Sequence, residues 1–383
     1  MTKHSFHLAL IAVPLLLSAC AGNGAPASKQ APASPNEIVI GVAGPMTGDL
    51  AAFGEQLRRG AEQAVADVNA EGGVLGKKLR LVIGDDQCDP KRAVQVAQRL
   101  IADGAVFVDG HFCSGSSIPA SELYAEAGVL QITPSSTNPK LTDSPAAMES
   151  KTLFRTCGRD DRQGTFAGAW IAKNYLTKKV AVFDDLSPYG RGVADETERA
   201  IQAGGVQPVL REHFTQKQSD FSEIIARLKD AHVEMVYFGG YHDQIAGFVR
   251  QAREQGFTGD FAAPDALNTS EFWSIAGSAG DGVRFTDASS QVNFVSAKSV
   301  VETFRSGNYE PEGYTLGSYA AVQAWAAAAA IAGSTEASQV GATLHSRTIP
   351  TVIGDLSWDH KGDLTHVNYA WFVWHEGQYT EEP

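Results

Sequence analysis

Hydroxyl side chains gather in the loops that follow two predicted strands in the first half of the chain. Ser114 comes after the apolar run 106–108, in a loop that opens a predicted helix, and Ser135 and Thr137 come after the run 129–132. Hydroxyls, free backbone N–H groups and a helix N-terminus together favour a carboxylate or a phosphate as ligand. A loop rich in Ser and Thr is more often a turn or a helix cap, so this signal is weak when taken alone.

A complementary set of side chains occupies the corresponding loops of the second half. Tyr189, Tyr241 and Asp265 each follow a predicted strand. A carboxylate beside aromatic faces suits an ammonium group, through charge pairing and cation–π contacts. A single loop Asp is more commonly a helix cap than a ligand contact. The two sets together predict a receptor for a zwitterion, which carries one anionic and one cationic group.

The sequence lacks the arrangements that are typical of enzymes. His111 and His242 lie in the same loops, but neither belongs to a nucleophile elbow, a zinc motif or a phosphate-binding loop. Gly41 and Gly44 do not form a dinucleotide-binding fingerprint, and no Cys-x-x-Cys or His-x-x-x-His spacing suggests a metal site. We therefore expect a binding protein that is not an enzyme and uses no cofactor or metal, with structural roles for both histidines.

Short β-branched runs alternate with helical patterns of period 3.6 along most of the chain, which predicts an α/β fold with doubly wound parallel sheets. In such sheets ligands bind beyond the carboxyl ends of the strands, where the loops described above lie. The pattern occurs in two similar series, so we expect two lobes. The predicted strands are 38–42, 79–83, 106–108, 129–132, 180–183, 206–214, 235–238, 261–263 and 371–374, and the predicted helices are 54–71, 90–103, 117–127, 163–176, 190–203, 221–231, 243–255 and 319–332.

Length and charge narrow the possible partners. The chain has 383 residues, which is more than the roughly 250–300 at which one hydrophobic core normally divides into two. Its net charge of −13 argues against a nucleic-acid partner, since no basic stretch could neutralise phosphates. We expect a monomer with a small ligand.

The N-terminus has the features of an export signal. Lys3 precedes an apolar segment of about ten residues, which is too short to span a bilayer. Leu17, Ser18, Ala19 and Cys20 follow, and this pattern resembles a bacterial lipobox, in which the Cys is lipidated. The sequence thus predicts a signal peptide at 1–19, a Pro-, Ala- and Ser-rich tether at 20–36 and a membrane anchor on Cys20; the alternative is an ordinary secretory signal.

Three further cysteines are expected to meet an oxidising compartment, in which two of them should pair. Cys88 and Cys113 each follow a predicted strand, and we expect these two strands to be neighbours. A Cys88–Cys113 disulfide would close a loop of roughly 25 residues, which stabilises a fold by about 3–4 kcal/mol. Cys157 is then left as a buried free thiol.

Across residues 38–376 the chain resembles the leucine/isoleucine/valine-binding proteins, the periplasmic receptors of branched-chain amino-acid ABC transporters. This resemblance implies a type I periplasmic-binding fold with two lobes and three crossovers. It places lobe one at 37–159 plus 288–365 and lobe two at 160–287 plus 366–383, and it supports the Cys88–Cys113 pairing. The matching motifs are 60–69, 85–90, 110–114, 132–134, 155–158, 237–242 and 358–363.

The resemblance also implies roles for individual residues. Ser114 and Thr137 would hold the ligand α-carboxylate through their hydroxyls, with help from the backbone near Phe112 and Ser135. The rings of Phe53, Tyr189 and Tyr241 would form an aromatic wall. Asp265 would bind the α-ammonium.

Two positions depart from the family pattern. Asp265 is one methylene shorter than the Glu of the branched-chain receptors, and Phe112 stands where an aliphatic residue is common. We therefore expect a lipid-anchored receptor in the bacterial periplasm that captures an aliphatic amino acid, branched-chain or smaller, and delivers it to ABC permease subunits. The alternative is a lipoprotein of the same fold that binds a protein partner in cell-envelope regulation.

Overall fold

The computed structural model describes residues 1–2, 34–215 and 217–382. The predicted signal peptide and Cys20 lie outside these residues. Within the described ranges, none of the helices combines the length and the apolar composition that a membrane crossing requires.

The first sheet has five parallel strands in the order β2-β1-β3-β4-β5. Helices cover both faces, as expected for a parallel sheet. Along β1, Ile38 and Ile40 face one hydrophobic cluster, whereas Val39 and Ala43 face another, because successive side chains of a strand point to opposite sides. The strands are β1 (Glu37–Gly44), β2 (Lys78–Asp85), β3 (Phe107–Gly110), β4 (Leu130–Thr133) and β5 (Leu153–Arg155).

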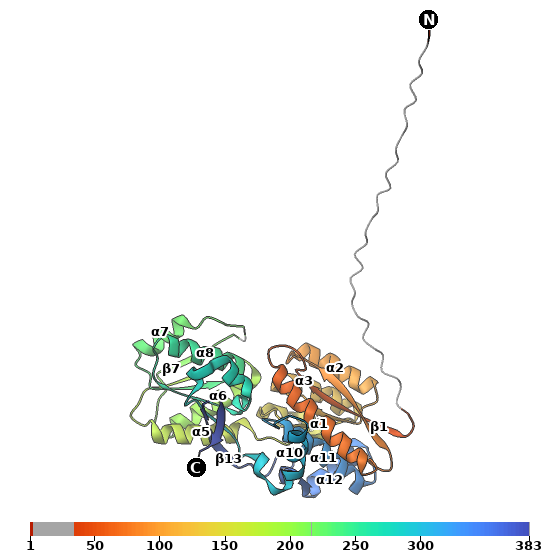
Figure 1. Cartoon of the computed structure of the whole chain (residues 1–383). Helices are drawn as coiled ribbons and strands as arrows, with labels where there is room; N and C mark the ends of the chain where they lie inside the picture. Colours follow the sequence, from red (N-terminus) through yellow and green to blue (C-terminus); the bar gives the residue numbers. More distant parts are fainter. Residues whose placement is uncertain (3–33, 216, 383) are drawn as a thin grey trace. The chain divides into compact units, whose positions relative to one another are not determined.

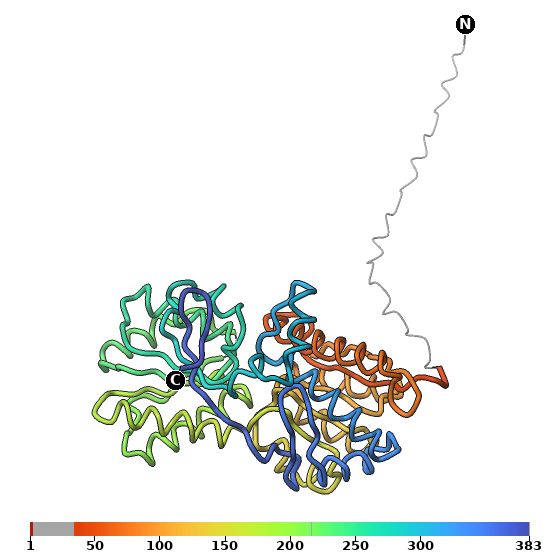
Figure 2. Tube along the Cα trace, turned by 60° about the horizontal axis from the view of Figure 1, so that its bottom comes forward, coloured from red at the N-terminus to blue at the C-terminus, as the bar shows by residue number. Residues whose placement is uncertain are grey.

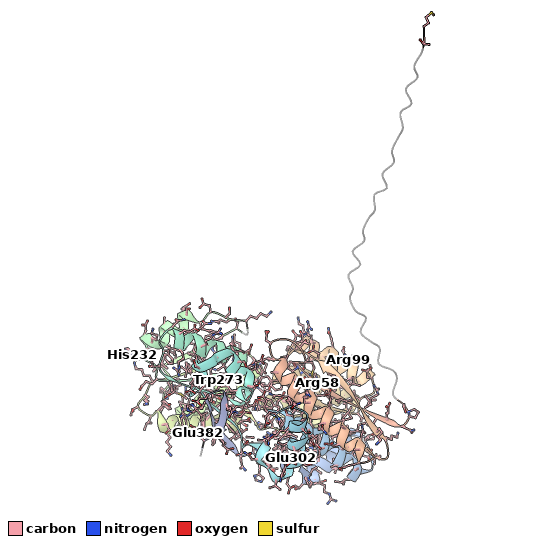
Figure 3. The ribbon with its side chains drawn as sticks, in the orientation of Figure 1. Arg58, Arg99, His232, Trp273, Glu302 and Glu382 are labelled. Carbon is pink, nitrogen blue, oxygen red and sulfur yellow. A yellow bond between two sulfur atoms is a disulfide. The ribbon has the colours of Figure 1, made fainter. Side chains whose placement is uncertain are left out.

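We define lobe one as this sheet with its helices. The cluster around Ile38 includes α1 and α11, which pack together although they are far apart in sequence (Figure 1). Helix α1 carries the partly exposed Arg58 (Figure 3). Its guanidinium pairs with Glu55 and Glu62 of the same helix. The helices are α1 (Ala51–Ala70), α2 (Pro90–Ala102), α3 (Ser114–Ala127), α4 (Pro145–Ser150), α10 (Lys298–Ser306), α11 (Thr315–Ala332) and α12 (Ala337–Ser346), with the small hairpin β11 (Ile349–Thr351) and β12 (Gly354–Leu356).

Lobe two is built on a seven-stranded sheet in the order β14-β13-β10-β9-β8-β6-β7. It is parallel except at one side, where β13 runs antiparallel to both β10 and β14. The strands are β6 (Val180–Asp184), β7 (Leu210–His213), β8 (Met235–Gly239), β9 (Asp260–Ala263), β10 (Arg284–Ala288), β13 (Tyr369–His375) and β14 (Gln378–Glu381); the helices are α5 (Asp160–Asn174), α6 (Pro188–Ala203), α7 (Ser222–Asp230), α8 (His242–Glu254) and α9 (Ser270–Ala276).

The chain passes between the two sheets three times: after β5, after β10 and before β13. Figure 2 shows the last passage, in which the C-terminal segment returns to lobe two. The expected two-lobe fold with three crossovers is therefore confirmed. The second sheet departs from the parallel arrangement at β13 and β14, and the expected strand 206–214 is reduced to β7.

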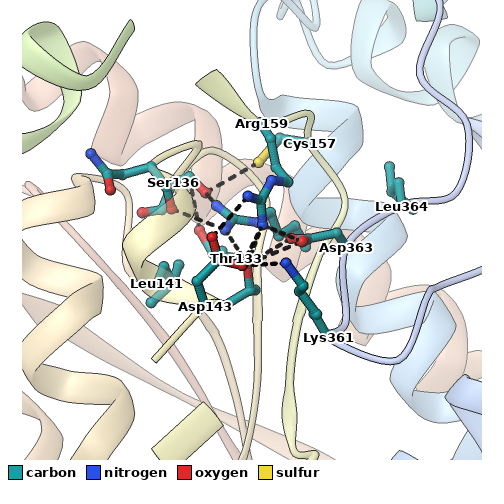
Figure 4. Close-up of polar contacts among 12 residues, drawn as sticks. Thr133, Ser136, Leu141, Asp143, Cys157, Arg159, Lys361, Asp363 and Leu364 are labelled. Carbon is teal, nitrogen blue, oxygen red and sulfur yellow. Dashed lines mark hydrogen bonds and ion pairs between the residues drawn. The ribbon is translucent and has the colours of Figure 1, made fainter. Parts of the chain in front are cut away.

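A buried ion-pair cluster fixes the first and third crossovers (Figure 4). Asp363 Oδ1 lies 2.6 Å from Arg155 Nε, and its Oδ2 lies 2.6 Å from Arg159 Nη1. Arg155 Nη2 also donates to Thr142 Oγ1 at 2.7 Å. Burial alone would raise the pKa of Asp363, but the two guanidinium groups lower it below its usual range. Each charge is thus paired and hydrogen-bonded, which offsets the cost of removing it from water.

The expected Cys88–Cys113 disulfide is present, with the two Cα atoms 5.5 Å apart, and Cys157 is a free thiol. The prediction that the two cysteines end neighbouring strands is wrong, because β1 lies between β2 and β3. The disulfide therefore spans the carboxyl end of β1 and joins the loops on either side of it.

Candidate functional site

A buried carboxylate, Asp265, lies where the two lobes meet. It begins a short helical turn after β9. Its Oδ1 accepts hydrogen bonds from Tyr189 Oη at 2.7 Å and Gln163 Nε2 at 3.2 Å, and its Oδ2 accepts one from Tyr314 Oη at 2.7 Å. Tyr189 and Gln163 belong to lobe two, whereas Tyr314 immediately precedes α11 of lobe one. This carboxylate is therefore held by donors from both lobes.

Burial and hydrogen bonding shift the pKa of Asp265 in opposite directions. Burial raises the pKa of Asp265, while the hydrogen bonds from Tyr314, Tyr189 and Gln163 lower it in part. Burial also raises the pKa of both phenols well above its usual value, so they remain protonated donors. A cation placed beside Asp265 would stabilise the ionised carboxylate.

Aromatic rings pack closely next to this carboxylate. Phe53 and Phe112 stack with ring centroids 4.5 Å apart, and Tyr314 meets the Phe112 ring edge-on at 5.0 Å. Tyr241 lies 6.2 Å from Phe112 and 5.0 Å from Tyr189. The structure thus brings together the predicted aromatic residues and adds Tyr314 to them.

The predicted hydroxyls lie on the lobe-one side. Ser114 is the first residue of α3, and its Oγ accepts a hydrogen bond from Asn138 N at 3.3 Å. Ser135 Oγ donates to the carbonyl oxygen of Phe112 at 3.0 Å, so its hydroxyl proton is not available to a ligand. Thr137 Oγ1 is buried and has no hydrogen-bond partner among the described residues. Thr137, and the hydroxyl proton of Ser114, are therefore the hydroxyl groups available to an anion.

His111 positions these loops and is buried within lobe one. Its Nδ1 lies 2.6 Å from Asp86 Oδ2, and its Nε2 lies 3.0 Å from Tyr124 Oη. Asp86 Oδ1 in turn accepts the backbone N–H of Cys88 at 2.8 Å. Together with the disulfide, these contacts tie the loops after β2 and β3 to each other. They hold Phe112, which follows His111 directly, in place.

A cavity of about 660 Å³ borders the site, which is within the range of roughly 300–1,000 Å³ typical of ligand pockets. Thr137, Gln163, Asp265 and Tyr314 line it, and it extends past Asp287. The rings of the predicted aromatic wall are packed against one another and do not border this space. The free volume thus lies on the Thr137 and Asp265 side of the site. Among the described residues, no three His, Cys, Asp or Glu side chains are arranged to hold a metal ion.

Two residues of the site, Tyr314 and Gln163, were absent from the sequence prediction. Gln163 was expected only as the start of a helix, and Tyr314 lies just before a helix that was expected to begin later. In the sequence, the signal for this region was Gly313, which directly precedes Tyr314 and is compatible with a turn. In the structure Gly313 has a positive φ of 54°.

Residues 37–377 match the family of periplasmic binding proteins. The chain is 46% identical over 351 residues to an amino acid binding protein of Pseudomonas aeruginosa, covering 91% of this chain and 93% of that relative. It is 43% identical over 343 residues to Leu/Ile/Val-binding protein homolog 2 of Brucella abortus, covering 89% and 91%.

Among solved structures, the fold is similar to a leucine binding protein from Thermotoga maritima, with a TM-score of 0.83, 27% identity, and coverage of 90% of this chain and 98% of that one. The resemblance to leucine/isoleucine/valine-binding proteins is thereby confirmed. The chain belongs to the periplasmic binding protein family.

Proposed function

We propose that this protein is the substrate-binding component of an ABC importer and captures an aliphatic amino acid between its two lobes. The observation that carries the proposal is that Asp265 and Thr137, whose hydroxyl has free bonding capacity, line the same cavity where the lobes meet. Ser114 of lobe one also has a hydroxyl proton that is free to bind an anion. Asp265 would bind the ligand ammonium, and the two hydroxyls would bind its carboxylate. The relatives' names, which refer to amino acids, support the same ligand class.

The packing of the aromatic rings favours a small or slender ligand. Phe112 is buried and stacks on Phe53, and Tyr314 closes the same region from lobe one. The Tyr314 hydroxyl also donates a hydrogen bond to Asp265 Oδ2, which leaves less room for a ligand around the proposed ammonium site. We therefore propose that alanine or valine is preferred over leucine.

The lobes are proposed to close over the ligand, and the closed form is proposed to dock on the permease. Hydrogen bonds already join the lobes in this structure. Asn138 Nδ2 of lobe one donates to Pro188 O at 2.6 Å, and Ser270 N of lobe two donates to Glu312 Oε2 at 2.9 Å. These bonds would break in an open form that admits ligand. The lobe limits, 37–159 plus 288–365 and 160–287 plus 366–383, are proposed on the same basis.

The binding proposal is tested by titration calorimetry on purified, ligand-stripped protein with the twenty amino acids. We expect binding of one or more aliphatic amino acids and little affinity for acidic ones. If no amino acid binds, the transport proposal fails, and a protein partner in the cell envelope becomes the better reading.

Membrane anchoring through Cys20 is proposed from the sequence motif alone. Replacing Cys20 by Ser should release the exported protein from the membrane fraction and reduce its mass by that of the lipid. If the Cys20→Ser protein stays in the membrane fraction with unchanged mass, the lipobox assignment is wrong.

A further inference from the structure

Asp160 is a fully buried carboxyl group between the two lobes. It is the first residue of α5, and its backbone N–H donates to Thr137 O at 3.0 Å. On the lobe-two side it packs against Gly192 of α6, where an added side-chain carbon would collide with Asp160 Oδ2 and with Asn138 Nδ2. Thr137 and Asn138 belong to lobe one, so parting of the lobes would expose this carboxyl group to water.

Neither oxygen of this carboxyl group has a hydrogen-bond partner among the residues that the structure describes. Thr137 Oγ1 lies close to this carboxyl group and is likewise without a hydrogen-bond partner among those residues. An ionised carboxylate that is buried without partners is strongly disfavoured, and the usual relief is to bind a proton. Asp160 is therefore expected to be protonated, and so neutral, when the lobes are closed.

The surrounding charges act in the same direction. Asp265 and Asp161 disfavour an ionised Asp160, whereas the Arg155 guanidinium, which favours it, is engaged by Asp363 and Thr142. The other titratable groups that face this region are neutral, because burial raises the pKa of each of them: Cys157, Tyr237, Tyr241 and Tyr369. Burial raises the pKa of Asp160 to about 8, although the Thr137 hydroxyl and Arg155 lower it in part.

The proposed ligand adds a further negative charge at this point. If Thr137 holds the ligand carboxylate, that carboxylate lies beside Asp160, and two adjacent carboxylates cannot both remain ionised in a buried site. A protonated Asp160 is instead a hydrogen-bond donor, and Thr137 Oγ1 is the unpartnered acceptor next to it. The Thr137 hydroxyl proton is then left for the ligand.

We propose that Asp160 is a positioning residue of the carboxylate side and takes up one proton from solvent when the lobes close over the amino acid. This inference rests on the proposed function. An exposed Asp in the open form has a pKa near 3.9, so at pH 7 binding should take up close to one proton per ligand. The dissociation constant should rise by up to about tenfold per pH unit between pH 5 and pH 7.

The test is titration calorimetry of the full chain with L-valine, L-alanine and L-leucine at pH 7, in buffers of different ionisation enthalpy. The wild type should take up close to one proton, and Asp160→Asn, which is neutral at every pH, should take up almost none. The affinity of Asp160→Asn should also be nearly constant from pH 5 to pH 7. Asp161→Asn, a matched change at the next and more exposed residue, should retain the proton uptake.

The outcomes separate the two proposals. Binding without proton uptake in the wild type, or equal uptake in Asp160→Asn, overturns the role of Asp160 and leaves the amino-acid receptor intact. Tighter binding of L-lysine without proton uptake overturns it as well, because a second ammonium would then neutralise the carboxylate. Failure of all three amino acids to bind overturns both proposals. The wild-type measurement stands on its own if Asp160→Asn does not fold.

Discussion

Replacing Asp265 by Asn should abolish the ammonium site while leaving its shape almost unchanged. The carboxylate accepts three hydrogen bonds, from Tyr189, Tyr314 and Gln163, and in the proposed complex it provides the negative charge that faces the ligand ammonium. Removing one partner of a buried charge pair costs about 2–5 kcal/mol. At about 1.4 kcal/mol per factor of ten, amino-acid affinity should fall by roughly 30-fold to a few thousand-fold.

The same substitution should change the stability of the empty protein in a pH-dependent way. Burial raises the pKa of Asp265 in the folded state above its value in the unfolded chain. Stability from this group is therefore fully present below the unfolded pKa of about 3.9 and is lost as pH rises toward the folded pKa. Since Asn does not titrate, the stability of Asp265→Asn relative to the wild type should increase between pH 4 and pH 7.

Calorimetric titration with L-valine and thermal unfolding without ligand, both at pH 4 and pH 7, measure the two effects. Asp230→Asn, a change at an exposed residue at the end of α7, is the control and should alter neither quantity. Unchanged valine affinity in Asp265→Asn would refute the ammonium role. A stability difference that stays constant with pH would refute the argument from burial.

Three other perturbations follow from contacts in the structure. Phe112→Leu should raise the affinity for leucine relative to alanine in competition binding, because space for each additional methylene is worth about 0.8 kcal/mol; an unchanged ratio would rule out the narrowing. Replacing Cys88 and Cys113 by Ser should lower the free energy of unfolding by about 3–4 kcal/mol in denaturant titrations, whereas Cys157→Ser should have a small effect. Asp363→Asn should cost about 3–5 kcal/mol at pH 7, since it removes the carboxylate that pairs with the buried Arg155 guanidinium. Asp363 has a lowered pKa, so its contribution is present above the unfolded carboxyl pKa and lost in acid, where variant and wild type should converge; a pH-independent difference would contradict this.

The sequence was sufficient to predict most of the strands and the loops that carry the site. Runs such as β6 and β8 are apolar along most of their length because both faces of a parallel sheet are covered, and this pattern is visible without tertiary information. Residues placed directly after such runs, such as Asp265 and Thr137, were predicted for the same reason. They lie at the carboxyl ends of strands, where open α/β sheets bind ligands.

Features that depend on contacts between distant segments were not predictable from local pattern. The strand direction of β13 is set by its pairing with β10, about eighty residues earlier in the chain. Tyr314 reaches Asp265 only because the chain returns to lobe one after β10. The unpaired state of Asp160 is equally invisible in sequence, where an Asp at the start of a helix reads as an ordinary stabilising charge near the helix N-terminus.

Because the chain passes between the lobes three times, each lobe needs segments from the C-terminal part of the chain to complete its core. Trp325 of α11 stacks on Phe107 in the core of lobe one, and Trp371 and Trp374 of β13 complete the core of lobe two. A polypeptide that ended before β13 would leave β10 as an open sheet edge, with the apolar surface of lobe two unsealed. Lobe one is completed only when α11 and α12 have been synthesised, and lobe two only when β13 and β14 have been added. A product that ends before β13 is thus expected to be aggregation-prone and exposed to proteolysis.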